Sequence, residues 1–107
     1  MSSYKLKFST RAEAQYQTLA NGGAATAAKL KKVQRALALL QQGPRHPGLH
    51  SHQYENFPGA PKAKVCDSYV ENKTPSAWRI FWTYGPNETV DGKEIAVITV
   101  LAITPHP

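Results

Sequence analysis

The stretch from Ala77 to Tyr84, Ala-Trp-Arg-Ile-Phe-Trp-Thr-Tyr, restricts the fold more than any other part of the chain. Successive side chains of a strand point to opposite faces, so it predicts a central strand with aromatic residues on one face and Arg79 on the other. A guanidinium stays charged at physiological pH and is costly to bury without an anionic partner. Arg79 therefore either pairs with a carboxylate of the protein, Asp67 or Glu71, or binds an external anion. We expect a phosphate.

The size of the chain and its charge narrow the range of partners. With 107 residues, we expect one domain, 1–107, around a single core. Thirteen Lys and Arg against seven Asp and Glu give a net charge of +6, and residues 1–53 hold eight of the bases but one acid, Glu13. Such a surface favours nucleic acid, an acidic protein segment or an anionic membrane, and a solvated basic face without a partner is the alternative.

Three features predict a cytoplasmic protein that does not associate with a membrane. No signal peptide is visible at the N-terminus. The apolar run Ile95–Ile103 is too short to span a bilayer. The lone cysteine, Cys66, excludes an internal disulfide and fits a reducing compartment. Because Cys66 lies in a strand-like run, a buried structural thiol is favoured over a catalytic thiolate.

The hydrophobic pattern predicts the element order β-α-α-β-β-β. A short strand over 4–8 precedes a helix that a Thr10-x-x-Glu13 capping box begins and Asn21-Gly22-Gly23 ends. The other expected elements are a longer amphipathic helix with a basic outer face over 24–42, a loop over 43–61, and strands over 63–70, 77–84 and 94–104. This order predicts an α+β fold, with an N-terminal strand, an antiparallel helical hairpin and a three-stranded antiparallel meander.

This order of elements, together with four motifs, resembles the RelE/ParE superfamily of toxins from bacterial type II toxin-antitoxin modules. The motifs are the loop Pro44-Arg45-His46-Pro47-Gly48-Leu49-His50-Ser51-His52, the pair Lys62-x-Lys64, Trp78-Arg79-Ile80-Phe81-Trp82, and a last apolar strand that ends Ile103-Thr104-Pro105-His106. The resemblance implies a RelE-like fold and a toxin that blocks translation by cutting mRNA in the ribosomal A site. It also implies a cognate antitoxin as partner, through which alone the toxin contacts operator DNA.

The same resemblance suggests roles for individual residues. Arg79 is similar to the strand arginine that contacts the scissile phosphate, and Lys62 and Lys64 resemble the paired lysines that bind RNA. His106 lies where several members keep a C-terminal histidine or arginine. His50 and His52 fall where some members carry a loop histidine.

Metal-free RNA cleavage needs a base for the 2′-hydroxyl proton, an acid for the 5′-oxygen, and cations beside the phosphate. Three histidines, His50, His52 and His106, suit the proton transfers, because an imidazole titrates near neutral pH. Arg79 and the two lysines suit the charge, so no cofactor or metal is expected. Arg45 and Tyr54 are the remaining candidates for RNA binding, Tyr54 by stacking on a base.

Other interpretations of these residues remain open. Lys62 and Lys64 could be edge-strand charges that discourage aggregation, and His106 could be a frayed end. The spacing of His46, His50 and His52 also permits a zinc site. At the level of function, the alternatives to an endoribonuclease are a ParE-like inhibitor of DNA gyrase without hydrolytic activity and a non-toxic corepressor that acts through its antitoxin.

Overall fold

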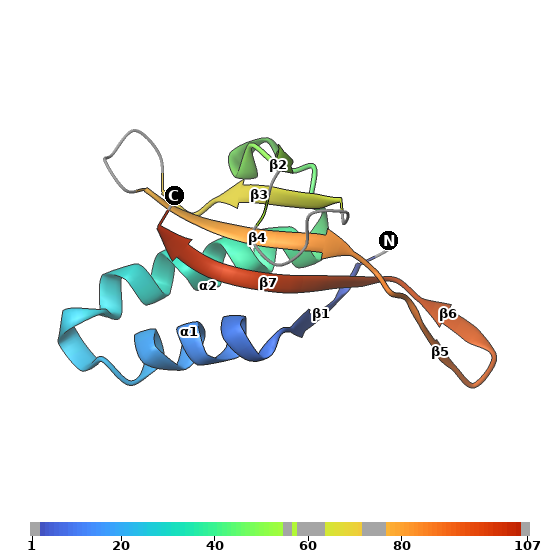
Figure 1. Cartoon of the computed structure of the whole chain (residues 1–107), viewed down its shortest axis with the longest axis horizontal. Coiled ribbons are helices and arrows are strands. Elements are labelled where there is room, and N and C mark those ends of the chain that lie inside the picture. Colours follow the sequence, from blue (N-terminus) through green and yellow to red (C-terminus); the bar gives the residue numbers. More distant parts are fainter. Residues whose placement is uncertain (1–2, 55–56, 58–63, 72–76, 106–107) are drawn as a thin grey trace.

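The computed structural model describes residues 3–54, 57, 64–71 and 77–105. Within these ranges the chain forms two α-helices, two 3-10 turns and seven strands (Figure 1). The helices and turns are α1 (Thr10–Ala20), η1 (Gly23–Ala25), α2 (Ala27–Gln42) and η2 (Pro47–Leu49). The strands are β1 (Lys5–Phe8), β2 (His52–Tyr54), β3 (Val65–Tyr69), β4 (Trp78–Tyr84), β5 (Glu88–Val90), β6 (Lys93–Ile95) and β7 (Val97–Pro105).

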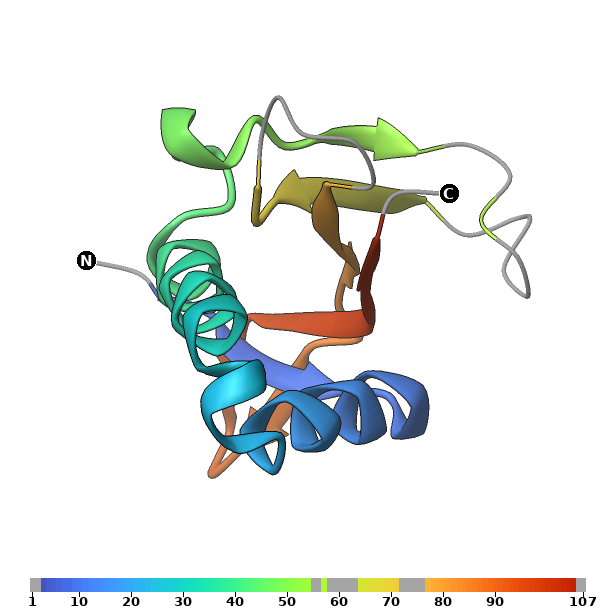
Figure 2. The ribbon, with the colours of Figure 1, turned by 90° about the vertical axis from the view of Figure 1, so that its left-hand side faces the viewer.

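Five strands form one mixed sheet in the order β1-β7-β4-β3-β2. Both helices cover one face of this sheet, as Figure 2 shows, and β5 and β6 form a separate hairpin that extends beyond its end (Figure 1). The main core lies between the helices and the sheet, where Val33 and Leu40 of α2 meet Ile80 and Trp82 of β4. The predicted α+β class with two helices is confirmed.

The three strands predicted to form an antiparallel meander correspond to β3, β4 and β7, which do pair antiparallel, but the sheet differs from a three-stranded meander in two respects. The sheet has two more strands, because β1 joins it at one edge and β2 at the other. It is also mixed, because β1 pairs parallel with β7 while the other pairs are antiparallel. In addition, the predicted last strand over 94–104 is divided between β6 and β7, since the Asp91-Gly92 turn, with positive φ at both residues, folds β5 and β6 into a hairpin of their own.

The segment 43–61, predicted to be a loop, contains a 3-10 turn and a strand within its described part. Leu49 of η2 is fully buried in the main core, and β2 pairs antiparallel with β3. Three residues are too few to show an alternating pattern, so the pairing that makes β2 a strand is visible only in the fold. The helix starts also differ. Ser9 rather than Thr10 caps α1, its Oγ accepting from the Ala12 N–H at 3.1 Å.

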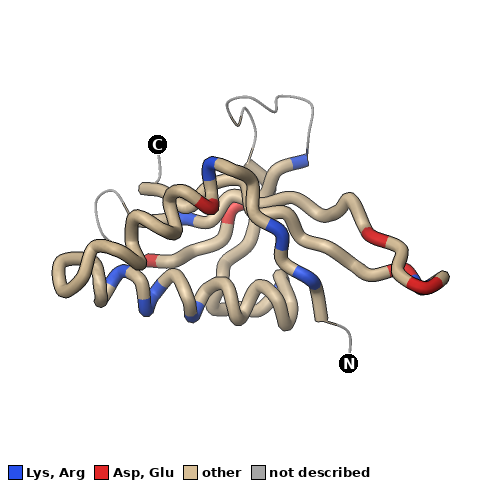
Figure 3. The backbone as a smooth tube through the Cα atoms, turned by 90° about the horizontal axis from the view of Figure 1, so that it is seen from below, with Lys and Arg blue, Asp and Glu red and all other residues tan. Residues whose placement is uncertain are grey.

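Charge is unevenly distributed over the molecule (Figure 3). Exposed bases run along α2, namely Lys31, Lys32 and Arg35, whereas the β5–β6 hairpin carries Asp91 and Glu94 near its tip. Glu88 at the base of the hairpin forms ion pairs with Lys5 and Lys7 of β1. Hydrogen bonds from Lys7 and then Lys5 lower the pKa of Glu88 to about 2. In the described part of the chain, no helix combines the length and the apolar character needed to cross a membrane.

Candidate active site

The face of the sheet opposite the helices, which we call the outer face, carries Arg79. Residues that pair across antiparallel strands point to the same side. The register pairs Arg79 with Tyr69 of β3 and Thr104 of β7, and the next outward-facing set along the strands contains His52, Asp67 and Phe81. Trp78, Ile80 and Trp82 belong to the core on the helix side. The predicted alternation along β4 is therefore confirmed.

Arg79 is partly exposed and lies over an aromatic ring. Its guanidinium carbon is 3.8 Å from the centre of the Tyr69 ring, a cation–π contact that fixes the plane of the group. Nη1 donates to the carbonyl oxygen of Glu71 at 3.0 Å and more weakly to that of Trp78 at 3.4 Å. None of the ion pairs between described residues includes Arg79, so neither Asp67 nor Glu71 neutralises it through its carboxylate.

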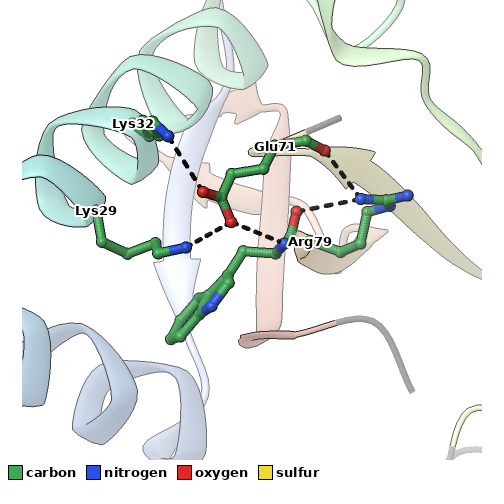
Figure 4. A network of polar contacts seen from close by, with 5 residues as sticks. Lys29, Lys32, Glu71 and Arg79 are labelled. Carbon is green, nitrogen blue, oxygen red and sulfur yellow. Dashed lines mark hydrogen bonds and ion pairs between the residues drawn. The ribbon is translucent and has the colours of Figure 1, made fainter. Parts of the chain in front are cut away.

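The carboxylate of Glu71 instead joins the sheet to α2 (Figure 4). It accepts from Lys29 at 2.5 Å and from Lys32 at 3.1 Å, and the backbone N–H of Trp78 donates to it at 3.2 Å. The hydrogen bond from Lys29 is the largest of the causes that lower the pKa of Glu71 to about 2, and Lys32 and Trp78 also contribute. Since the carbonyl of the same residue receives Arg79, Glu71 connects the guanidinium to the helix layer.

His52 and Asp67 form a pair on the outer face beside Tyr69. The Asp67 side chain is fully buried and its Oδ1 is 2.9 Å from Nε2 of His52, whose own side chain is 51% exposed. The other ring nitrogen, Nδ1, is 2.9 Å from the carbonyl oxygen of His50, which can only accept. Both nitrogens of His52 thus lie close to oxygen atoms of other residues. The pair anchors β2 on β3.

His50 is the imidazole that remains available for a substrate. Its ring lies 4.9 Å from that of Tyr69, and among the described residues its nitrogens make no hydrogen bond. The backbone around it is fixed on both sides. Leu49 is buried before it, and the Ser51 hydroxyl after it hydrogen-bonds that of Ser68 in β3 at 2.6 Å. His50 itself adopts the left-handed conformation, with φ of 47°.

Two pockets lie near this group. One, of about 190 Å³, is lined by His50 and Tyr69 from the sheet side and by Lys32 and Arg35 of α2. The other, of about 240 Å³, lies past the end of α2 and includes Arg45 and His52 among its lining residues. Arg79 lines neither pocket, and each pocket has at least one cation in its wall.

The structure brings together three of the four predicted catalytic residues. Arg79 and His50 both contact the Tyr69 ring, and His52 lies 6.3 Å from it. His106 lies outside the described residues. Asp67 and Tyr69 complete the group, although neither was predicted as a site residue. The two residues are two positions apart in a predicted strand, and this spacing indicated that they share a face.

The predicted RNA-binding residues are more scattered. Arg45 lines the larger pocket, and Lys64 is exposed just before β3. Tyr54 is half-buried and packs edge-on against Phe81, with ring centres 5.1 Å apart, in a small apolar cluster on the outer face. Lys62 lies outside the described residues.

A catalytic thiolate at Cys66 and a metal site have less support in the described residues. Burial raises the pKa of the Cys66 thiol, and the nearby Asp67 carboxylate raises it further, so thiolate formation is disfavoured. Across the described ranges, no three His, Cys, Asp or Glu side chains gather as a metal site would require.

Comparison of the chain with models of protein families, with curated proteins and with solved structures gave no match.

Proposed function

We propose that this protein is the toxin of a type II toxin-antitoxin module and inhibits translation by ribosome-dependent cleavage of mRNA. The observation that carries the proposal is Arg79. It is a guanidinium held over Tyr69 on the outer face, partly exposed and without a carboxylate partner among the described residues, and the imidazole of His50 contacts the same Tyr69 ring. An uncompensated cation beside a proton-transfer group is the arrangement that phosphodiester cleavage needs.

Arg79, His50 and His52 have separate roles in the proposed cleavage of mRNA. The Arg79 guanidinium binds the scissile phosphate and stabilises the negative charge that builds on its oxygens. His50 removes the proton of the 2′-hydroxyl, because its ring nitrogens make no hydrogen bond to other described residues. The 2′-oxygen then bonds to phosphorus, the bond from phosphorus to the 5′-oxygen breaks, and water protonates the leaving 5′-oxygen. Both ring nitrogens of His52 contact other residues, so His52 positions His50 through the contact with its carbonyl oxygen. The ribosome supplies the remaining contacts to the mRNA.

The proposal includes a cytoplasmic location and a cognate antitoxin that covers the site. The exposed bases of α2 are equally suited to ribosomal RNA, to DNA or to an acidic protein, so they do not separate this proposal from inhibition of DNA gyrase. The groups around Tyr69 favour the nuclease, because an inhibitor without hydrolytic activity needs no imidazole in the same site as a phosphate-binding guanidinium.

The test is primer extension on mRNA from a purified translation reaction to which the protein is added. The unaltered protein is expected to produce cleavage within codons in the ribosomal A site. Arg79→Ala is expected to reduce the cleavage rate by at least about 100-fold, the effect typical of losing one charge-stabilising group. Arg79→Lys is expected to recover part of it, since a lysine keeps the charge without the planar fork.

Arg11→Ala is the matched control, because it removes one positive charge from the exposed surface of α1. It is expected to cleave like the unaltered protein. Circular dichroism and thermal melting of each variant show whether the fold is retained. Full cleavage by a folded Arg79→Ala variant would refute the assignment. Inhibition of gyrase supercoiling, with mRNA left intact, would favour the other branch of the superfamily.

A further inference from the structure

The larger pocket combines aromatic walls, a side-chain amide and a cation. Its floor follows the register across three strands, in which Gln53 of β2 lies opposite Cys66 of β3, and Cys66 lies opposite Trp82 of β4. Tyr84, two residues further along β4, contacts Trp82 edge to face, with ring centres 4.9 Å apart. Arg45, just past the end of α2, completes the lining. The helix layer ends here, so this part of the sheet is not covered by α2.

Exposure sets Tyr84 apart from the other aromatic residues of β4. Trp82 is 1% exposed and Tyr84 is 49% exposed, although both point to the helix side of the sheet. A half-exposed ring next to a pocket of about 240 Å³ offers a flat surface to a ligand. Arg45 is exposed at the rim, and no carboxylate belongs to the described residues that line this pocket, so these residues do not repel an anion.

From these observations we infer that the pocket binds a single nucleobase of the RNA, stacked on Tyr84 and hydrogen-bonded by the Gln53 amide, with its phosphate at Arg45. The inference rests on the proposed function and adds a subsite to it. Aromatic stacking binds any base through its π face, whereas an amide carries both a donor and acceptors and can read a base edge. The chemistry of the wall therefore fits a nucleotide better than a purely apolar or purely anionic ligand.

The position of the pocket supports a role in the same reaction. His52 belongs to β2, lies in the wall of this pocket and pairs with Asp67 on the outer face, so the two sites share a strand at the edge of the sheet. A strand of RNA that passes over β2 can place its scissile phosphate at Arg79 and a neighbouring base in the pocket. The subsite then contributes to the choice of the cleaved sequence.

The experiment is NMR titration of the ¹⁵N-labelled protein with the four nucleoside 5′-monophosphates and with ribose 5-phosphate, which has the sugar and phosphate but no base. We expect the nucleotides to shift the side-chain amide of Gln53 and the backbone amides of Ser51 and Gln53. Ribose 5-phosphate should bind at least about tenfold more weakly, which is the contribution of stacking one base. Tyr84→Leu, which keeps an apolar side chain but removes the π face, should weaken nucleotide binding by a similar factor.

Arg79→Ala separates this inference from the proposed function, because Arg79 lies on the other face of the sheet and does not line the pocket. It should reduce mRNA cleavage by at least about 100-fold and leave the nucleotide-induced shifts at Gln53 unchanged. Nucleotide binding without mRNA cleavage by the unaltered protein would refute the proposed function and keep the pocket. Equal affinity for ribose 5-phosphate and nucleotides, equal affinity in a folded Tyr84→Leu variant, or the absence of shifts at Gln53 would overturn the inference.

Discussion

Replacing Glu71 by glutamine tests whether the ion pairs that join β3 to α2 hold the segment around Arg79 in place. The substitution keeps the size of the side chain and the backbone carbonyl that receives Arg79, but removes the charge that Lys29 and Lys32 bind. The Glu71 side chain is 14% exposed, so solvent replaces these contacts only in part. We expect the variant to fold and to be less stable than the unaltered protein at neutral pH.

The size of the effect follows from the pKa. The change from the ordinary value of 4.5 to about 2 corresponds to about 3 kcal/mol at about 1.4 kcal/mol per pKa unit. Lys32 is 55% exposed, and screening by solvent reduces the contribution of such a pair. We therefore expect the free energy of unfolding to fall by about 1 to 2 kcal/mol at pH 7.

The pH dependence has a definite sign. Because folding lowers the pKa of Glu71, its contribution is present in full above pH 4.5 and is lost as the pH falls towards 2. Urea unfolding of the two proteins should show a constant difference from pH 6 to 7 that shrinks below pH 4.5. Glu13→Gln is the control, because the Glu13 carboxylate is exposed and accepts only from the Gln17 amide among the described residues. A Glu71→Gln difference that did not change with pH, or that Glu13→Gln reproduced, would refute the reasoning.

Two further predictions concern the interior near the site. Ser68→Ala removes the acceptor of the buried Trp82 indole N–H, a hydrogen bond of 2.8 Å, and should lower the free energy of unfolding by about 1 to 3 kcal/mol, as measured by urea unfolding. Ser51→Ala leaves that hydrogen bond intact and should lower the free energy of unfolding by less. Equal losses in the two variants would contradict a stabilising role for the bond between Trp82 and Ser68. Cys66 should react with iodoacetamide with a pH midpoint above that of the urea-unfolded protein, since burial raises its pKa in the folded state; identical midpoints would show that the thiol is not desolvated.

Local patterns were enough to predict much of the fold. The alternation around Arg79 predicted a strand and placed the arginine on the face opposite Trp78 and Trp82, and the structure confirms both. Helical spacing and the Gly43-Pro44 signal located α2 to within three residues at its start and correctly at its end. Of the two edge strands, β1 was predicted but its parallel pairing was not, and β2 was missed. The three residues of β2 carry too little pattern, and the direction of β1 depends on its pairing with a strand that lies about ninety residues away.

For the candidate site too, the sequence determined some features and the tertiary structure determined others. The sequence by itself determined the net charge, the histidine-rich segment and an arginine on a central strand, because these follow from composition and from a period of two residues. Only the tertiary structure decided which groups contact one another. The Glu71 carboxylate pairs with lysines of α2, so Arg79 has no acidic partner among the described residues. Tyr69 lies beneath the guanidinium, and Asp67 contacts His52 but not His50. The reason is physical. Each of these contacts joins elements far apart in the chain, and their register is set by the packing of the whole sheet against the helices rather than by any local preference.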